Sequence, residues 1–303
     1  MNQATFITKS IGAVEDPTKM LRNLICSSEL SFLMEAHDGL SAAIARQAGF
    51  KGLWASGLSI SSALGYRDAN EASWTEIVDV VERIADASGL PILVDGDSGF
   101  GNFNNARLLA MKLLKRGGAG VCLEDKRFPK MNSFVGDRQA LADIVEFSGR
   151  LKAIKDMTGS DLVLVARTEA LIAGYGLDEA LQRADAYAES GADALLIHSR
   201  KSDAGEILAF AKRWQKLPIV IVPTKYYRTP ASIYRDAGIS TVIWANHAMR
   251  AAVAGMRAVC NRIVAEESIA GVEPGIATLE EVFGLLRYDE LVSAQDRYLP
   301  QYG

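Results

Sequence analysis

Short apolar runs alternate with amphipathic stretches along most of the chain. Eight runs rich in Val, Ile, Leu and Ala have the length of buried strands, and they lie at residues 31–36, 52–56, 91–95, 120–124, 162–166, 194–198, 218–223 and 241–245. The stretches between them, such as 105–116 and 177–189, are rich in the helix formers Ala, Leu, Lys, Arg and Glu. The pattern therefore predicts a chain that alternates strand and helix.

Glycines precede the even-numbered strands. They are Gly49, the pair Gly117 and Gly118, Gly191 and Gly238. Glycine suits the left-handed cap that ends a helix before the chain enters a strand. The odd-numbered strands have other lead-ins, and such a difference is compatible with a closed barrel whose interior layers draw on alternate strands. We therefore predict a (β/α)8 TIM barrel; the alternative is an open, doubly wound sheet.

The chain shows no linker, so we expect one domain over residues 1–303. Residues 248–303 exceed the single helix needed to close a barrel, and the run 251–267 is apolar on one side. This pattern predicts a C-terminal helical extension. It packs either on its own barrel or on a second subunit, as in an exchange of helices between protomers.

Composition narrows the classes of partner. The formal charge of -4 lacks the basic excess that nucleic-acid binding requires. No run approaches the roughly 20 apolar residues of a membrane span, and the N-terminus does not resemble a signal peptide. Cys26, Cys122 and Cys260 form no CxxC pair, which argues against a zinc site or a disulfide framework. We expect a cytoplasmic protein that binds neither nucleic acid nor membranes.

Polar residues follow each predicted strand. In such barrels the active site lies at the carboxyl ends of the strands. The segments at these ends are 35–38, 56–58, 95–99, 124–126, 167–169, 198–200, 224–225 and 246–247, and they contain all three histidines. A single polar strand end is usually a solvated loop, but eight of them meet at one mouth. We expect the functional site there.

Carboxylates gather on one part of this mouth. Asp95, Asp97 and Glu124 end adjacent strands, and Asp68 lies in the loop after the second strand. Oxygen-only ligands favour a hard cation, and Mg²⁺ with several retained waters fits best. Opposite these acids we place Arg167, His198 and Lys130, cations suited to a phosphoryl or carboxylate group. The predicted ligand is a small anion bridged by Mg²⁺.

Two segments carry a resemblance to a known family. Residues 95–102, DGDSGFGN, resemble the metal-site segment of the phosphoenolpyruvate mutase/isocitrate lyase superfamily, and the likeness covers nearly the whole chain. Residues 124–133 are similar to the signature of its mutase branch, which is EDK, five residues, then NS. The resemblance implies an isomerase that moves a phosphoryl group within phosphoenolpyruvate to give phosphonopyruvate, in phosphonate biosynthesis.

The same loop separates the branches of the superfamily. The lyases carry a cysteine-containing Lys-Lys/Arg-Cys-Gly-His segment here, and this loop has no cysteine. Phosphonopyruvate hydrolase resembles the mutase but has threonine where this chain has Asn132. Hydrolase and lyase activities therefore remain the alternatives, as does a binding protein without activity. Asn132 itself could instead only cap a turn.

The resemblance also assigns roles to residues. Asp95 is implied as the principal Mg²⁺ ligand, with Asp97, Glu124 and Asp68 holding its waters. Backbone amides of Ser56, Gly57 and Leu58 are implied to bind the pyruvate enolate, with Trp54 as a wall. Around the phosphoryl group the resemblance places Arg167, His198, Asn132, Lys130 and Ser133.

The implied mechanism is dissociative, so the phosphoryl group passes as a metaphosphate-like species without a covalent nucleophile. A phosphoenzyme on Asp68 is the competing mechanism. Residues 126–139 are expected to form a lid that excludes water. Gly96 and Ser98 stand where many mutases have alanine and threonine, and the lid is slightly short. Relatives imply a homotetramer or homodimer, coupled to a downstream enzyme such as phosphonopyruvate decarboxylase.

Overall fold

A computed structural model describes residues 15–135 and 140–299. Eight parallel strands pair in chain order, and β1 pairs with both β2 and β8, so the sheet closes into a barrel. The strands are β1 (Ser31–Ala36), β2 (Gly52–Ala55), β3 (Ile92–Asp95), β4 (Gly120–Glu124), β5 (Val163–Thr168), β6 (Ala194–Ile197), β7 (Ile219–Ile221) and β8 (Thr241–Trp244). The predicted (β/α)8 barrel is confirmed, and the open sheet is excluded.

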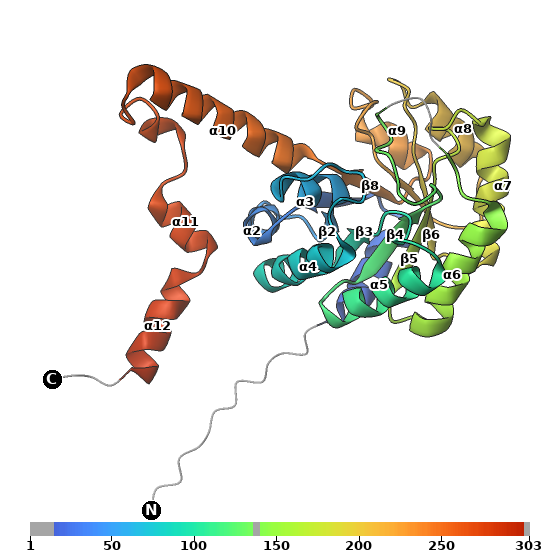
Figure 1. Ribbon diagram of the computed structural model, residues 1–303, viewed down its shortest axis with the longest axis horizontal. Coiled ribbons are helices and arrows are strands. Elements are labelled where there is room, and N and C mark those ends of the chain that lie inside the picture. Colours follow the sequence, from blue (N-terminus) through green and yellow to red (C-terminus); the bar gives the residue numbers. More distant parts are fainter. Residues whose placement is uncertain (1–14, 136–139, 300–303) are drawn as a thin grey trace, which may run out of the picture.

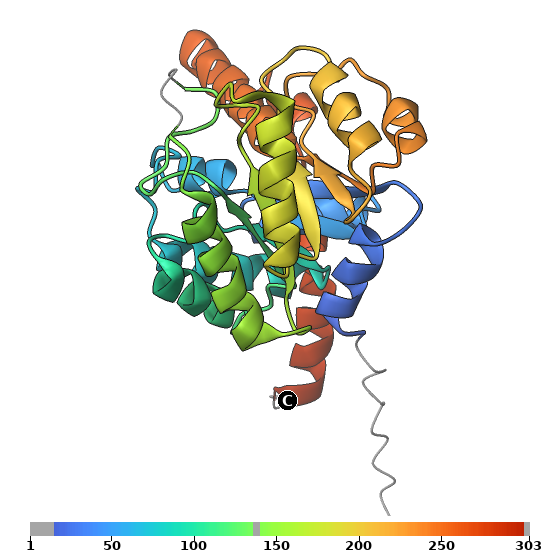
Figure 2. The same ribbon diagram turned by 90° about the vertical axis from the view of Figure 1, so that its right-hand side faces the viewer.

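Helices surround the barrel (Figure 1, Figure 2). They are α1 (Pro17–Ile25), α2 (Gly39–Gln47), α3 (Gly57–Ala63), α4 (Trp74–Ser88), α5 (Phe103–Lys115), α6 (Ile144–Thr158), α7 (Gly176–Glu189), α8 (Gly205–Arg213), α9 (Ala231–Asp236), α10 (His247–Glu266), the 3-10 turn η1 (Glu273–Gly275), α11 (Leu279–Leu285) and α12 (Tyr288–Tyr298). The helix α4 shows why they form: Ser73 and Glu76 make a capping box at its start, and Gly89 ends it with a left-handed φ of 61°.

The strand bounds agree closely with the apolar runs, except at β5 and β7. β7 ends at Ile221, two residues before its predicted end. β5 continues to Thr168, two residues beyond its predicted end, and thus contains Arg167. A charged residue ended the apolar run, but here it is buried by ion pairs at the barrel mouth. The expected contrast in lead-ins is also weaker than predicted, because Gly89 before β3 is left-handed like Gly49 before β2.

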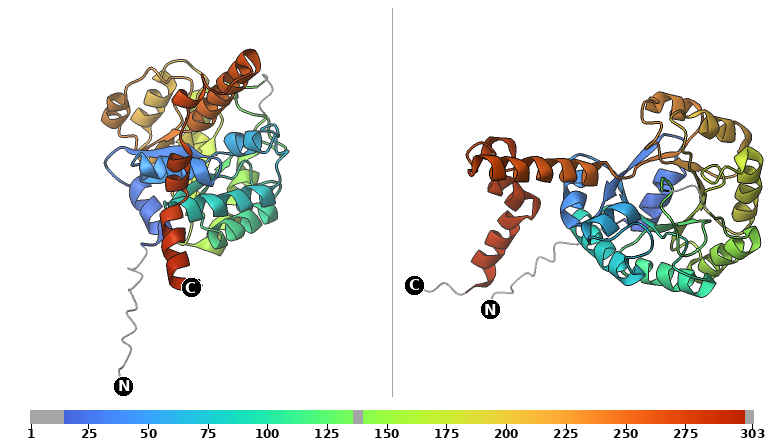
Figure 3. Two further views of the ribbon diagram at one scale, coloured as in Figure 1. Left: turned by 90° about the vertical axis from the view of Figure 1, so that its left-hand side faces the viewer. Right: turned by 45° about the horizontal axis from the view of Figure 1, so that its top comes forward.

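The barrel interior is closed at its lower end by α1. Leu21 and Ile25 of this helix are fully buried and pack with interior side chains such as Leu33, Leu93 and Val165. The right-hand view in Figure 3 shows α1 within the ring of outer helices. A second, larger apolar layer lies between the strands and those helices. Among the described residues, α1 therefore blocks the end of the barrel opposite the carboxyl ends of the strands.

The C-terminal extension leaves the barrel. In Figure 1, α10 projects from the end of β8, and α11 and α12 descend from its far end, where α11 contacts α2. None of these three helices contains a buried residue, and apolar side chains such as Met256 and Val264 are exposed. The helical extension is thus present, whereas an exchange between subunits stays a prediction. No helix in the described ranges is both long and apolar enough to span a bilayer.

Candidate active site

A polar pocket opens at the carboxyl ends of the strands. Among the residues singled out from the sequence, it is lined by Trp54, Ser56, Leu58, Asp68, Asp95, Glu124, Lys130, Asn132, Ser133, Arg167 and His198. Gly57 and Asp97 lie behind this wall and donate backbone hydrogen bonds to Asp95. The structure therefore brings the predicted site residues together in one place.

Asp95, the last residue of β3, is held from two directions. The N–H of Gly57 donates to Oδ2 and the N–H of Asp97 to Oδ1, both at 3.3 Å. Burial raises the pKa of Asp95 more than Lys130 and Arg167 lower it. Its neighbour Asp97 behaves alike, since burial raises the pKa of that carboxyl to about 8. These carboxylates lack sufficient positive charge around them.

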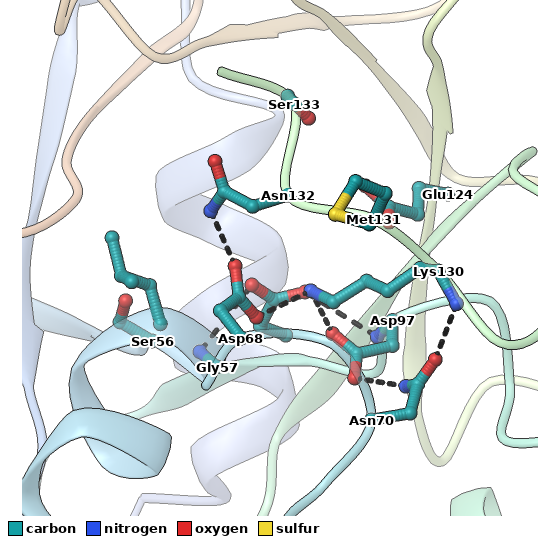
Figure 4. Close-up of polar contacts among 12 residues, drawn as sticks. Ser56, Gly57, Asp68, Asn70, Asp97, Glu124, Lys130, Met131, Asn132 and Ser133 are labelled. Carbon is teal, nitrogen blue, oxygen red and sulfur yellow. Dashed lines mark hydrogen bonds and ion pairs between the residues drawn. The ribbon is translucent and has the colours of Figure 1, made fainter. Parts of the chain in front are cut away.

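Lys130 supplies part of that charge (Figure 4). Its ammonium lies 2.8 Å from Asp68 Oδ1 and also pairs with Asp97 Oδ1. Burial lowers the pKa of Lys130, but Asp97 and Asp68 outweigh this and hold it well above its usual value. The structure thus corrects the expectation that Lys130 faces the acids from the opposite side. Buried carboxylates attract the nearest cation, and here the loop after β4 brings one among them.

Asn132 makes two kinds of contact from the same loop. Its Oδ1 accepts from the N–H of Phe134 at 2.9 Å, so the turn-capping role that the sequence left open is real. Its Nδ2 also donates to Asp68 Oδ2 at 2.6 Å, across the pocket mouth (Figure 4). The side chain therefore shapes the loop and fastens it to the loop between α3 and α4. Residues 136–139 of the expected lid lie outside the described residues.

Arg167 and His198 form the opposite side of the pocket. The fully buried Glu169 accepts from Arg167 Nε at 2.6 Å and lies 3.0 Å from His198 Nδ1. Burial lowers the pKa of His198, and Arg167 lowers it further, so the ring is neutral near pH 7. Its Nε2 is buried and has no hydrogen-bond partner within the described part of the chain. That nitrogen is placed to meet a ligand.

The three side chains of the EDK motif, residues 124–126, have different surroundings and different roles. Glu124 lines the pocket, whereas Asp125 points into the surrounding layer and accepts from Tyr187 Oη at 2.7 Å. Lys126 is buried and donates to the carbonyl of Met131 at 2.9 Å and to Ser133 Oγ at 2.6 Å. The lysine therefore holds the following loop from within.

Ser133 connects that loop to the Arg167 side. Its hydroxyl donates to Glu169 Oε2 at 2.6 Å and accepts from Arg167 Nη2 at 3.0 Å. Lys126 also lies 3.1 Å from Glu169. One buried carboxylate thus binds two cations and a lid hydroxyl, which explains why the pKa of Glu169 lies well below its usual value although burial raises it.

The predicted amide cluster is partly engaged within the protein. The N–H of Ser56 donates to the carbonyl of Ala36 at 3.3 Å, and the N–H of Gly57 is directed at Asp95. Leu58 lies in the first turn of α3, where amides are not used by the helix itself. The Leu58 amide and the Ser56 hydroxyl are therefore the donors best placed for a ligand.

Sequence reasoning missed several contributors. Asn70, Lys126, Phe134 and Glu169 join the network, and Thr224 and Asn246 line the far wall. Lys126, Glu169, Thr224 and Asn246 did stand at predicted strand ends, which was a usable signal. Nothing in the pattern distinguished inward from outward side chains there.

The acidic side of the pocket fits a hydrated divalent cation. Among residues 15–135 and 140–299, no three His, Cys, Asp or Glu side chains come close enough to bind one ion directly. Glu124 Oε1 is nevertheless buried without a hydrogen-bond partner in those ranges, and Asp95 lines the same pocket. Mg²⁺ often binds through one or two carboxylates and several waters. Asp95 as direct ligand, with the other acids acting through water, stays a prediction.

The comparisons with known proteins agree with this site. A family model described as phosphoenolpyruvate phosphomutase matches residues 21–264, which contain the whole pocket. The chain belongs to this family. The phosphoenolpyruvate phosphomutase of Tetrahymena pyriformis is 52% identical over 294 residues, covering 96% of this chain and 98% of that protein. The predicted family is therefore confirmed.

Solved structures of relatives superpose over nearly the whole chain. The phosphoenolpyruvate phosphomutase from Streptomyces platensis subsp. rosaceus has a TM-score of 0.91 at 40% identity, covering 93% of this chain and 99% of that one. A phosphonopyruvate hydrolase in complex with oxalate and Mg²⁺ has a TM-score of 0.88 at 37% identity, covering 94% and 99%. Both the fold and the superfamily's association with Mg²⁺ agree with the sequence.

Gly96 and Ser98, which the resemblance singled out as departures from the usual pattern, are both closely packed. A Cβ at Gly96 would lie 2.6 Å from Val121 Cγ2 and 3.1 Å from the carbonyl oxygen of Cys122. Since φ at Gly96 lies outside the left-handed region, packing alone requires glycine there. Ser98 is fully buried, and its carbonyl accepts from Arg150 at 2.7 Å.

Proposed function

We propose that this protein catalyses the Mg²⁺-dependent interconversion of phosphoenolpyruvate and 3-phosphonopyruvate by intramolecular phosphoryl transfer. The observation that carries the proposal is the division of one pocket into two sides. Asp68, Asp95, Asp97 and Glu124 on one side exceed the charge of Lys130, whereas Arg167, Lys126 and His198 on the other side share Glu169. A ligand made of a cation and a phosphorylated acid suits both sides.

Mg²⁺ would be held by Asp95, with Asp97, Glu124 and Asp68 acting through its waters, and would supply positive charge next to the pyruvate unit. The Leu58 amide and the Ser56 hydroxyl would orient the pyruvate carboxylate, with Trp54 as an apolar wall beneath it. These groups fix the three-carbon unit so that its oxygen and its methylene carbon can reach the same phosphorus.

The phosphoryl group would be bound by Arg167 and by Nε2 of His198. In the tautomer protonated at Nε2, Nδ1 accepts from Arg167 Nη2, 2.8 Å away, and Nε2 donates to a phosphoryl oxygen. The bond from phosphorus to the enolate oxygen breaks, and the methylene carbon of the same pyruvate then bonds to phosphorus. No proton needs to be transferred, and no covalent nucleophile is required.

Asp68 supports this direct transfer. Both of its oxygens accept from lid residues, Oδ1 from Lys130 and Oδ2 from Asn132. Burial raises its pKa, but Lys130 and Asn132 outweigh this and lower it, so the group stays ionised and occupied. A carboxylate engaged in this way is suited to holding the lid and the cation's waters, and the phosphoenzyme is disfavoured.

The lid would exclude water while the phosphoryl group is between its two partners. Lys130, Asn132 and Ser133 lie over the pocket and are each fixed to its walls. Phosphonopyruvate hydrolase is the second candidate function, because a hydrolase structure matches at 37% identity. Asn132 on the lid favours the mutase. A C–C lyase is disfavoured, since the loop has no cysteine and Cys122 is buried in the barrel.

The proposed reaction also indicates the pathway and the neighbouring enzyme. We propose a cytoplasmic enzyme of phosphonate biosynthesis that works with an enzyme consuming phosphonopyruvate, such as a decarboxylase. The exposed apolar residues of α10 to α12 support a homodimer or homotetramer with exchanged helices.

A phosphorus NMR time course of the purified protein with Mg²⁺ and phosphonopyruvate tests the activity. Growth of a phosphoenolpyruvate signal is expected. Inorganic phosphate with pyruvate would instead indicate the hydrolase. Unchanged phosphonopyruvate would exclude both and direct attention to lyase substrates or to a binding role.

A further inference from the structure

Asn70 connects the lid to the acidic side of the pocket through a single amide. It lies in the loop between α3 and α4, and its side chain reaches two partners (Figure 4). Oδ1 accepts from the backbone N–H of Lys130 at 2.6 Å, and Nδ2 donates to Asp97 Oδ2 at 2.7 Å. The orientation of the amide is determined by its partners, because a peptide N–H only donates and a carboxylate only accepts.

The contacts of Lys130 and Asn70 form one closed arrangement. The side chain of Lys130 pairs with Asp97 Oδ1, while Asn70 satisfies Asp97 Oδ2. The backbone of Lys130 in turn rests on Asn70. Any movement of the lid away from the pocket therefore removes a charge from Asp97 and, at the same time, frees the amide that orients it.

The backbone at Asn70 is built for this position. Its φ of 57° lies in the left-handed region, which asparagine tolerates better than most residues. The same conformation places a practical limit on mutagenesis, because alanine there would add backbone strain to the loss of the amide. Glycine removes the side chain without that strain, and aspartate keeps both the shape and the backbone preference.

We infer that Asn70 is a positioning residue that couples closure of the lid to the orientation of Asp97. The inference rests on the proposed function in one respect: the orientation of Asp97 matters because Asp97 is expected to hold the waters of the cation. It does not rest on that function for its test. Closure of the lid would bring the Lys130 ammonium to Asp97 and fix the Asn70 amide. Opening of the lid would remove both contacts at once.

The first measurement is limited tryptic digestion followed by mass spectrometry, with Mg²⁺ and oxalate present. Trypsin must bind the Lys130 side chain, which is buried between Asp68 and Asp97, so cleavage after Lys130 reports opening of the lid. Asn70→Gly should raise the rate of this cleavage about tenfold, equivalent to about 1.4 kcal/mol. A rate equal to that of the unmodified protein would overturn the inference.

Asn70→Asp separates coupling from a simple latch. Aspartate keeps an acceptor for the Lys130 N–H but places a carboxylate oxygen against Asp97 Oδ2. Coupling predicts a cleavage rate raised at least as much as in Asn70→Gly, and a Mg²⁺ affinity lowered about tenfold in calorimetry with oxalate. Full protection of the lid with unchanged Mg²⁺ affinity would show a latch only and contradict the coupling.

Glu71→Gln is the matched control. Glu71 is the next residue in the same loop, and it accepts from Arg67 on the exposed surface. In Glu71→Gln, the rate of cleavage after Lys130 and the Mg²⁺ affinity should stay within about twofold of those of the unmodified protein. An effect as large as that of Asn70→Gly would mean general loosening of the loop and would sink the inference. If the expected pattern appears in a protein without mutase turnover, the coupling stands and the proposed function fails.

Discussion

The lid is attached to the pocket on two sides that differ in charge and burial. On the acidic side, Lys130 and Asn132 contact Asp68 and Asp97 at the pocket mouth. On the basic side, Ser133 and Lys126 meet Glu169, which is fully buried. The acidic side has more carboxylates than cations, and the basic side has more cations than carboxylates.

Because of this difference in charge, the two attachments of the lid have different roles. On the basic side the contacts of the lid itself are made within the protein, because the buried Glu169 binds both Lys126 and Ser133. The acidic side is incomplete, because burial raises the pKa of both Asp95 and Asp97 although Lys130 is present. We infer that the basic side anchors the lid, whereas the carboxylates of the acidic side need a further cation to balance their charge.

The largest effect should come from removing the centre of the acidic side. Asp95→Ala is expected to lower Mg²⁺-dependent turnover by at least about 10³-fold, because it deletes the proposed direct ligand. Thermal unfolding should show little loss of stability, since a carboxylate with a raised pKa opposes folding near pH 7. Near-normal turnover would remove Asp95 as the ligand. Asp79→Ala, on the exposed face of α4, serves as the control.

Breaking the anchor should instead affect the fold. Glu169→Gln leaves the buried Lys126 without its counter-charge and Arg167 with only Glu124, 3.4 Å away, so a loss of about 3 kcal/mol in the free energy of unfolding is expected in urea denaturation. Glu266→Gln removes a carboxylate from an exposed pair with Arg262 and should cost under about 0.5 kcal/mol. Equal stabilities for the two variants would refute the assignment of an anchor.

Acid titration sharpens the same test. Burial raises the pKa of Glu169, but Arg167, His198 and Lys126 hold it well below its usual value of 4.5. A carboxyl with a lowered pKa contributes its full stability above the unfolded pKa, and that contribution is lost as the pH falls through the folded pKa. The stability difference between the unmodified protein and Glu169→Gln should therefore be constant above about pH 5.5 and shrink below about pH 4.5. A difference independent of pH would contradict this.

A smaller effect is expected at the lid's acidic attachment. Asn132→Thr removes the donor to Asp68 Oδ2 and is expected to raise the ratio of inorganic phosphate to phosphoenolpyruvate several-fold, about 1 kcal/mol. Phosphorus NMR of the two products measures it. Met131→Leu changes the exposed side chain beside it and should leave the ratio unaltered. An unchanged ratio in Asn132→Thr would remove the argument for mutase over hydrolase.

The smallest effect concerns the outer edge of the basic side. Lys225 Nζ lies 4.7 Å from the centre of the Phe134 ring, and that ring packs edge-on against His198 at 5.2 Å. Lys225→Ala should raise tryptic cleavage after Lys130 by about threefold or less, since exposed cation–π contacts contribute about 0.5–1 kcal/mol. An increase beyond tenfold would mean that surface contacts, rather than Glu169, anchor the lid.

The sequence predicted the barrel well because its strands are buried on both faces. Such strands appear as continuous apolar runs, and β1 and β4 have the bounds expected from them. α1 was not anticipated, although Leu21 and Ile25 close the barrel, because nothing local distinguishes a closing helix from a surface helix. The extension was predicted as helix, but the lack of buried residues in α10, α11 and α12 could not be predicted.

The site was predicted as a set of residues and less well as an arrangement. The strand ends located Asp95, Glu124, Arg167 and His198 because topology alone brings strand ends together. Lys130 was misplaced because a loop's path depends on the charges that it meets. Asn70 was missed for the same reason: its role comes from a left-handed backbone angle and two partners remote in the sequence.

The close approach of position 96 to Val121 also constrains which substitutions the turn after β3 can accept. An alanine introduced at Gly96 first would be overpacked, because its Cβ would fall 2.6 Å from a valine methyl. A smaller residue at 121 introduced first leaves a gap that the alanine can then fill. Alanine at position 96 is therefore expected to be tolerated better together with a smaller residue at position 121 than alone.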